Sequence, residues 1–144
     1  MDDDGSQPHV ALSDRQDLPV DGDALADLAR STLVAEGVRS GELSLSFVTG
    51  DEIADLHQRY MDEPGPTDVL SFPQDDPRAA EQPRLIGDVV VCPRYALEDG
   101  RDLEPELRLL VVHGVLHLLG YDHEAEEERR AMWERQERYA GMRP

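Results

Sequence analysis

Paired cysteines and long apolar runs are both missing from this sequence. Its 144 residues include a single cysteine, Cys92, so no internal disulfide can form and the fold needs another source of stability. No run of about 18 apolar residues is present, which excludes a membrane-spanning helix, and the acidic start Met1-Asp2-Asp3-Asp4 is unlike a signal peptide. These absences predict a protein of the cytoplasm.

Positive charge is also scarce. The chain has 32 acidic residues against 14 basic ones, for a formal net charge of −18, and every basic residue is an arginine. Such a chain should bind nucleic acid or an anionic membrane poorly in a non-specific way, which counts against a simple RNA-binding module. Any contact with phosphate would use the planar, forked guanidinium group.

The spacing of apolar residues predicts a mixture of strands and helices. Residues 1–8 read as a disordered acidic tail, and residues 9–144 as a single domain. The predicted strands cover 9–12, 43–48, 67–72 and 85–91, with a polar loop at 74–83. The predicted helices run from 21 or 23 to 37, from 51 to a break at 64–66, from 103 to 119, and from 124 to 139.

This mixture predicts an α+β fold (mixed α/β), with one small mixed sheet packed with several helices. Segment 85–91 is apolar and β-branched enough to be a central strand, whereas the prolines around 67–72 favour an edge strand. The helix 103–119 is apolar nearly all round from Leu109 onward, which predicts burial. The last helix should pack on the outside through Met132 and Trp133.

Three histidines near the end of the predicted buried helix form the main candidate site. His113 and His117 are four residues apart, so they lie on one helix face about 6 Å apart along the axis. Gly120 permits the chain to turn, which lets His123 reach the same ion. One such histidine alone is usually a hydrogen-bonded core residue. Three together favour a metal site, because one metal ion gives the two buried imidazoles of His113 and His117 a shared partner.

Three nitrogen ligands suit zinc and leave a fourth position for water, which is the catalytic arrangement. The ion would lower the pKa of that water towards ~7 and act as a Lewis acid on a carbonyl or phosphoryl oxygen. Gly114 stands where a zinc protease of the H-E-x-x-H type has its glutamate, which disfavours proteolysis. Asp122 and Glu124 flank His123. Either could act as a general base or could hydrogen-bond to a ligand ring and orient it, and either can also be read as a solvated loop carboxylate.

Three segments in order resemble one known family. Residues 113–123 read H-G-V-L-H-L-L-G-Y-D-H, which is similar to the H-G-x-L-H-L-x-G-Y-D-H signature of the YbeY family. Residues 66–73 and 86–91 resemble its P-T-D-V-L-S-F-P and L-G-D-I-x-I segments. These are bacterial rRNA maturation factors described as single-strand-specific, metal-dependent endoribonucleases. The resemblance covers about residues 40–140 and implies one zinc ion per chain, at His113, His117 and His123.

The chain departs from the family at one arginine. Many members have an arginine directly after the tyrosine that precedes P-T-D-V-L-S-F-P, and after Tyr60 this chain has Met61. Positions 59 and 61 of a helix point about 200° apart, so Arg59 would not face the same way. Arg59, Arg84 or Arg94 are candidates to bind phosphate, and each is also readable as an exposed surface arginine.

Other polar residues of the matching segments are candidates for substrate binding. Asp68 and Ser71 belong to this group, although in an edge strand both can simply hydrogen-bond nearby backbone. Asp88 is a carboxylate within an apolar strand and should have a partner, such as a ligand histidine or an arginine. With Arg84, these are the expected substrate-binding residues.

The resemblance implies an endoribonuclease that matures rRNA, chiefly of the small subunit, and takes part in ribosome quality control. Its expected partners are rRNA, other single-stranded RNA, and ribosomal or ribosome-associated proteins, with no membrane and no DNA. The charge of −18 and the arginine missing after Tyr60 favour a second hypothesis, a non-enzymatic ribosome assembly factor with a structural metal. A third is hydrolysis of a small phosphate or amide substrate. No phosphate-binding glycine loop or dinucleotide fingerprint is present.

Overall fold

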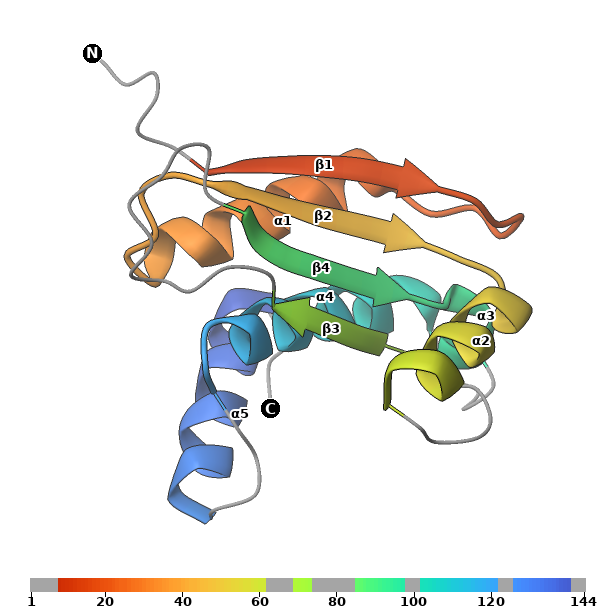
Figure 1. Ribbon diagram of the computed structural model, residues 1–144. Coiled ribbons are helices and arrows are strands. Elements are labelled where there is room, and N and C mark those ends of the chain that lie inside the picture. Colours follow the sequence, from red (N-terminus) through yellow and green to blue (C-terminus); the bar gives the residue numbers. More distant parts are fainter. Residues whose placement is uncertain (1–7, 62–68, 74–84, 98–101, 122–125, 141–144) are drawn as a thin grey trace.

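The computed structural model describes residues 8–61, 69–73, 85–97, 102–121 and 126–140. Within these residues the strands are β1 (His9–Asp14), β2 (Glu42–Phe47), β3 (Val69–Pro73) and β4 (Leu85–Val91). They form a 4-stranded sheet in the order β1-β2-β4-β3 (Figure 1). β1, β2 and β4 are parallel, and β3 runs antiparallel to β4 at one edge. The sheet is therefore mixed, as predicted, with segment 85–91 in an inner position.

The helices are α1 (Gly22–Ala35), α2 (Gly50–Met61), α3 (Pro93–Leu97), α4 (Leu103–Leu118) and α5 (Glu126–Ala140). The α+β fold class is confirmed. Sequence reasoning missed α3, because Cys92-Pro93 reads only as the end of a strand. A proline is well accommodated at the first position of a helix, where its missing N–H is not needed. The predicted tail residues 1–7, the break at 64–66 and the loop at 74–83 lie outside the described residues.

Local signals in the sequence set the ends of α1, the helix that connects the parallel strands β1 and β2. Parallel neighbours require a crossover connection of this kind. The carboxylate of Asp21 accepts a hydrogen bond from the backbone N–H of Ala24 at 3.2 Å, which caps the first turn. Gly37 follows the helix with a φ of 90°, a conformation that glycine adopts without strain. The helix therefore begins and ends where the sequence predicted.

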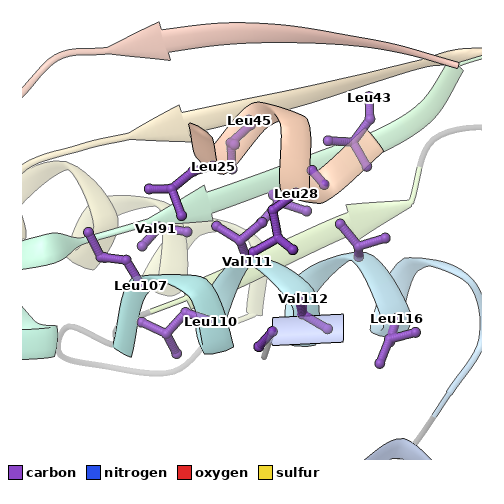
Figure 2. Close-up of a cluster of buried hydrophobic side chains, with 14 of the residues drawn as sticks. Leu25, Leu28, Leu43, Leu45, Val91, Leu107, Leu110, Val111, Val112 and Leu116 are labelled. Atoms are coloured by element: carbon purple, nitrogen blue, oxygen red, sulfur yellow. The ribbon is translucent and has the colours of Figure 1, made fainter. Parts of the chain in front are cut away.

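The main core lies between one face of the sheet and the helices α1, α4 and α5 (Figures 1 and 2). Leu45, Val89 and Val91 point from the strands into this core, and Val111 and Val115 of α4 meet them with no exposed surface. Because α4 is covered by the sheet on one side and by α5 on another, its apolar residues occur nearly all round the helix. The predicted burial of this helix is confirmed.

Helix α5 contacts the core through one narrow stripe. Met132 and Ala140 are 0% and 2% exposed, whereas Trp133 is 57% exposed. The prediction that Trp133 packs inward with Met132 is therefore wrong, because adjacent residues of a helix point about 100° apart. The inward positions recur every fourth residue, and Gln136 occupies the one between Met132 and Ala140.

Helix α2 packs against the opposite face of the sheet. There Ile53 joins Val90 and the single cysteine, Cys92, in a second and smaller buried cluster. Strand alternation separates the two clusters, because Val89 and Val91 face α4 while Val90 faces α2. Within the described ranges, no helix has both the length and the apolar content needed to cross a bilayer.

Candidate functional site

His113 and His117 lie side by side near the C-terminal end of α4. Their ring planes are 5° from parallel, and the ring centroids are 6.3 Å apart. His113 is half-buried and His117 is exposed. The structure therefore brings together the two histidines that the sequence placed on one helix face, and it leaves the outer ring open to solvent.

A tight turn ends α4 directly after the two histidines. The N–H of Gly120 donates to the carbonyl of His117, and the N–H of Tyr121 donates to the carbonyl of Leu116, each at 3.1 Å. These two bonds form a Schellman motif, which requires a left-handed residue that Gly120 supplies with a φ of 105°. The turn directs the chain out of the helix just before Asp122 and His123.

A buried amide contacts the inner histidine. Nδ1 of His113 lies 2.7 Å from Oε1 of Gln136, which reaches across from α5. Gln136 is 7% exposed, so its side chain is almost fully removed from water. The ring of His113 is thus held by a hydrogen bond on the side away from solvent.

On the sheet side, α4 packs closely against side chains of β4 and β3 at Gly114. A Cβ atom at this position would lie 2.6 Å from Cγ1 of Val89 and 3.2 Å from Oγ of Ser71. The hydroxyl of Ser71 donates to the carbonyl of Gly114 at 3.2 Å, which ties the edge strand β3 to the helix one residue after His113. Glycine at this position thus allows the histidine-bearing helix to lie directly on the sheet.

Replacing Gly114 by alanine should destabilise the fold by about 1–3 kcal/mol, because the added methyl overpacks the contact with Val89. This loss should exceed the gain of about 1 kcal/mol that alanine brings to a helix interior. Urea denaturation of Gly114→Ala, Val89→Ala and the double variant measures the coupling. The loss should be smaller in the Val89→Ala background, and an unchanged loss would show that the contact with Val89 is not its cause.

Four side chains form a polar cluster, the Glu36 cluster, between the end of α1, helix α5 and the turn after α4. Glu36 accepts hydrogen bonds from the hydroxyls of Tyr121 at 2.7 Å and Tyr139 at 2.5 Å, and from Nε of Arg135 at 3.1 Å. The Arg135 guanidinium also lies over the Tyr121 ring, 5.1 Å from its centroid. Tyr121 is thereby fixed two positions before His123.

The pKa values of Glu36 and of the two tyrosines are shifted by burial and by the hydrogen bonds between them. Burial alone would raise the pKa of Glu36, but the hydrogen bonds from Tyr139 and Tyr121 and the charge of Arg135 hold it below its ordinary value of 4.5. Burial and the Glu36 carboxylate raise the pKa of both tyrosine hydroxyls above 10.0. Near neutral pH the cluster therefore contains one carboxylate, one guanidinium and two neutral hydroxyls.

Other predicted site residues lie away from this helix. Arg59 is exposed on α2 and forms an ion pair with Asp55 at 2.8 Å. Asp88 faces the α2 side of the sheet, where it lines an open hollow with Ser46 and Phe72. Arg94 is exposed on α3. Neither α2 nor Asp88 is on the side of the sheet that carries His113 and His117.

Several predicted residues lie outside the described residues, namely Asp68, Arg84, Asp122, His123 and Glu124, together with the side chain of Met61. Among the residues that the structure describes, no group of three or more His, Cys, Asp or Glu side chains is arranged to hold a metal ion. Of the three predicted metal ligands, the structure describes two, His113 and His117.

Sequence reasoning missed Glu36 and Gln136. A signal for Gln136 exists, because it is the polar member of the stripe Met132, Gln136 and Ala140 and so had to be buried with a partner. Nothing local signals Glu36, whose partner Tyr121 is 85 residues away in the sequence.

The chemistry of the described donors fits a transition-metal ion such as zinc. Imidazole is a preferred zinc ligand, and two imidazoles on one helix face can converge on one ion. A ligand histidine almost always hydrogen-bonds through its second ring nitrogen to an oxygen acceptor, and Gln136 provides that acceptor for His113. Fold and site together define the class: a small α+β protein with a candidate histidine metal centre at the end of a buried helix.

Comparison with known proteins identifies the family within this class. The family model described as "Endoribonuclease YbeY" matches residues 12–142. A curated relative named Endoribonuclease YbeY from Thermobifida fusca is 43% identical, over 93% of this chain and 94% of its own. One of the same name from Parafrankia sp. is 50% identical, over 78% and 79%. The solution structure of TM1509 from Thermotoga maritima has a TM-score of 0.58 and 29% identity, over 91% of this chain and 86% of its own.

The chain therefore belongs to the YbeY family of endoribonucleases. Membership in an enzyme family weighs against the non-enzymatic assembly factor that the charge of −18 favoured.

Proposed function

We propose that this chain is a zinc-dependent endoribonuclease that cleaves single-stranded RNA. Its role would be the maturation of rRNA, chiefly of the small subunit, and ribosome quality control in the cytoplasm, together with ribosomal or ribosome-associated proteins. The observation that carries the proposal is the pair of parallel imidazoles at the end of α4, in a chain whose relatives are named endoribonucleases.

The zinc site of this proposal consists of His113, His117 and His123. The first two would present ring nitrogens from one helix face, and the turn at Gly120 would bring the third. When bound, the ion would supply a Lewis acid and would lower the pKa of a water molecule at its open position. Because the ring of His117 is exposed, RNA would reach the ion from the side of this ring.

The remaining steps use carboxylates and arginines of this chain. Asp122 or Glu124 would accept the proton of the attacking water, or would hydrogen-bond to a ligand ring and hold its orientation. Asp68, Ser71, Arg84 and Asp88 are the proposed substrate contacts. Arg59 and Asp88 lie on the α2 side of the sheet, away from His113 and His117, so Arg59 would act by binding RNA phosphate rather than at the metal ion. Because Arg59 already pairs with Asp55 in an exposed position, it would have to exchange this partner for phosphate.

Cleavage assays with RNA of different structure test the proposal. End-labelled single-stranded RNA, duplex RNA and single-stranded DNA would each be incubated with the metal-free chain and with the chain restored by one equivalent of zinc. We expect internal cuts in single-stranded RNA alone, and only with zinc. A folded chain that holds one zinc ion and leaves single-stranded RNA intact would overturn the proposed function.

A further inference from the structure

Gln136 places an amide in the inward-facing stripe of α5, whose other members are apolar. It lies between Met132 and Ala140 on the inward stripe, and it is 7% exposed. An amide buried in such a place costs free energy unless it is hydrogen-bonded. Its Oε1 lies 2.7 Å from Nδ1 of His113 on α4, a distance typical of a strong hydrogen bond.

The direction of this hydrogen bond fixes the proton on His113. A glutamine Oε1 atom is only an acceptor, so Nδ1 must be the donor and must carry the hydrogen. In a neutral imidazole the other nitrogen then has the lone pair, and here it is Nε2. A metal ion binds an imidazole through the nitrogen with the lone pair, so Gln136 decides which nitrogen of His113 is presented.

We infer that Gln136 is a positioning residue that selects the Nδ1–H tautomer of His113 and so presents Nε2 to the metal. The inference deepens the proposed function and rests on its metal site. The contact of Ser71 with Gly114 supports it, because this bond holds α4 from the sheet side while Gln136 holds the ring from α5. Gln136 thus orients the His113 ring on a helix whose backbone Ser71 holds against the sheet, and the ring of His117 is exposed.

Ring nitrogen shifts from NMR of the metal-free full-length chain test the tautomer directly, at a pH where the ring is neutral. We expect His113 to carry its proton on Nδ1 in the original chain and in Gln136→Glu, whose carboxylate also accepts. In Gln136→Leu we expect the Nε2–H tautomer to appear. Either a proton on Nε2 in the original chain, as a reversed amide would give, or an unchanged tautomer in Gln136→Leu would overturn the inference.

Zinc affinity provides a second measurement on the same proteins. Loss of a hydrogen-bond partner behind a ligand histidine typically weakens metal binding about 10–100-fold, and we expect a loss of this size in Gln136→Leu but not in Gln136→Glu. Gln58→Leu, the same change at an exposed position of α2, is the matched control and should leave zinc affinity unchanged. Competition with a chelator of known affinity gives the values.

Failure of the inference can be distinguished from failure of the proposed function. If Gln136→Leu has the original tautomer and zinc affinity while the chain still cleaves RNA, the inference is wrong and the function stands. If the tautomer and the affinity change as expected in a chain that cleaves no RNA, the inference stands and the function is wrong. Should Gln136→Leu fail to fold, Gln136→Met offers a flexible side chain of similar length that lacks the amide.

Discussion

Replacing His117 by alanine is expected to remove the metal ion and to lower the cleavage of single-stranded RNA at least about a hundredfold. A catalytic metal contributes several kcal/mol to stabilising the transition state, and each 1.36 kcal/mol corresponds to about a tenfold change in rate. Because the His117 ring is exposed, its removal takes little packing from the core, and the fold should be retained. Elemental analysis, circular dichroism and initial rates on labelled RNA measure the three effects.

His9→Ala is the matched control for this variant. His9 is an exposed histidine at the start of β1, so the same change there should leave both metal content and cleavage as they are. If His117→Ala cleaved RNA at the original rate while elemental analysis found no metal, the ion would have no part in the reaction. The proposed zinc dependence would then be wrong.

Glu36→Ala is expected to destabilise the fold by about 2–4 kcal/mol, one of the largest effects of a single polar change in this chain. Its side chain is 11% exposed in the ion pair with Arg135, and two tyrosine hydroxyls also donate to it. Alanine would leave these donors without their acceptor in a place that water reaches poorly. Urea denaturation of the full chain gives the free energy of unfolding.

Asp55→Ala is the control, because Asp55 also forms an ion pair but is 60% exposed. Exposed pairs contribute about 0–1 kcal/mol, so this variant should stay close to the original stability. Equal losses in Glu36→Ala and Asp55→Ala would show that burial of the Glu36 cluster adds nothing.

The contribution of Glu36 should also depend on pH. Its pKa in the fold lies below 4.5, so near that pH the unfolded chain takes up a proton before the folded chain does. The stability that the ionised carboxylate contributes is fully present above this range and is lost as the pH falls through the folded pKa. The stability difference between the original chain and Glu36→Gln should therefore shrink in acid, and a difference that stayed constant would contradict the depressed pKa.

Local information in the sequence was sufficient for most of the secondary structure and for the pair of histidines in the candidate site. Turn residues such as Gly37 and Gly120 ended the helices where predicted, because left-handed backbone favours glycine whatever surrounds it. The spacing of His113 and His117 placed both rings on one face of α4, because the helix has a fixed period. The family was indicated by residue identities alone, through three matching segments that follow one another in the expected order.

Where periodicity was absent or ambiguous, only the tertiary structure could decide which face of a helix or strand is buried and against what. The run Val89-Val90-Val91 is apolar on both faces of β4, so the sequence could not tell that Asp88 faces α2 rather than α4. Trp133 looked like a core residue beside Met132, yet α5 buries a stripe too narrow for both.

The contacts that hold the candidate site lie between residues far apart in the chain. Gln136 reaches His113 across 23 residues, and Tyr139 reaches Glu36 across 103. Glu36 and Tyr139, each taken alone, resemble ordinary polar residues on a helix surface. The sequence by itself determined every described helix and strand except α3, and which residue types they carry. Only the packing of α1, α4 and α5 decided which polar groups became buried together, because burial removes water as their competing hydrogen-bond partner.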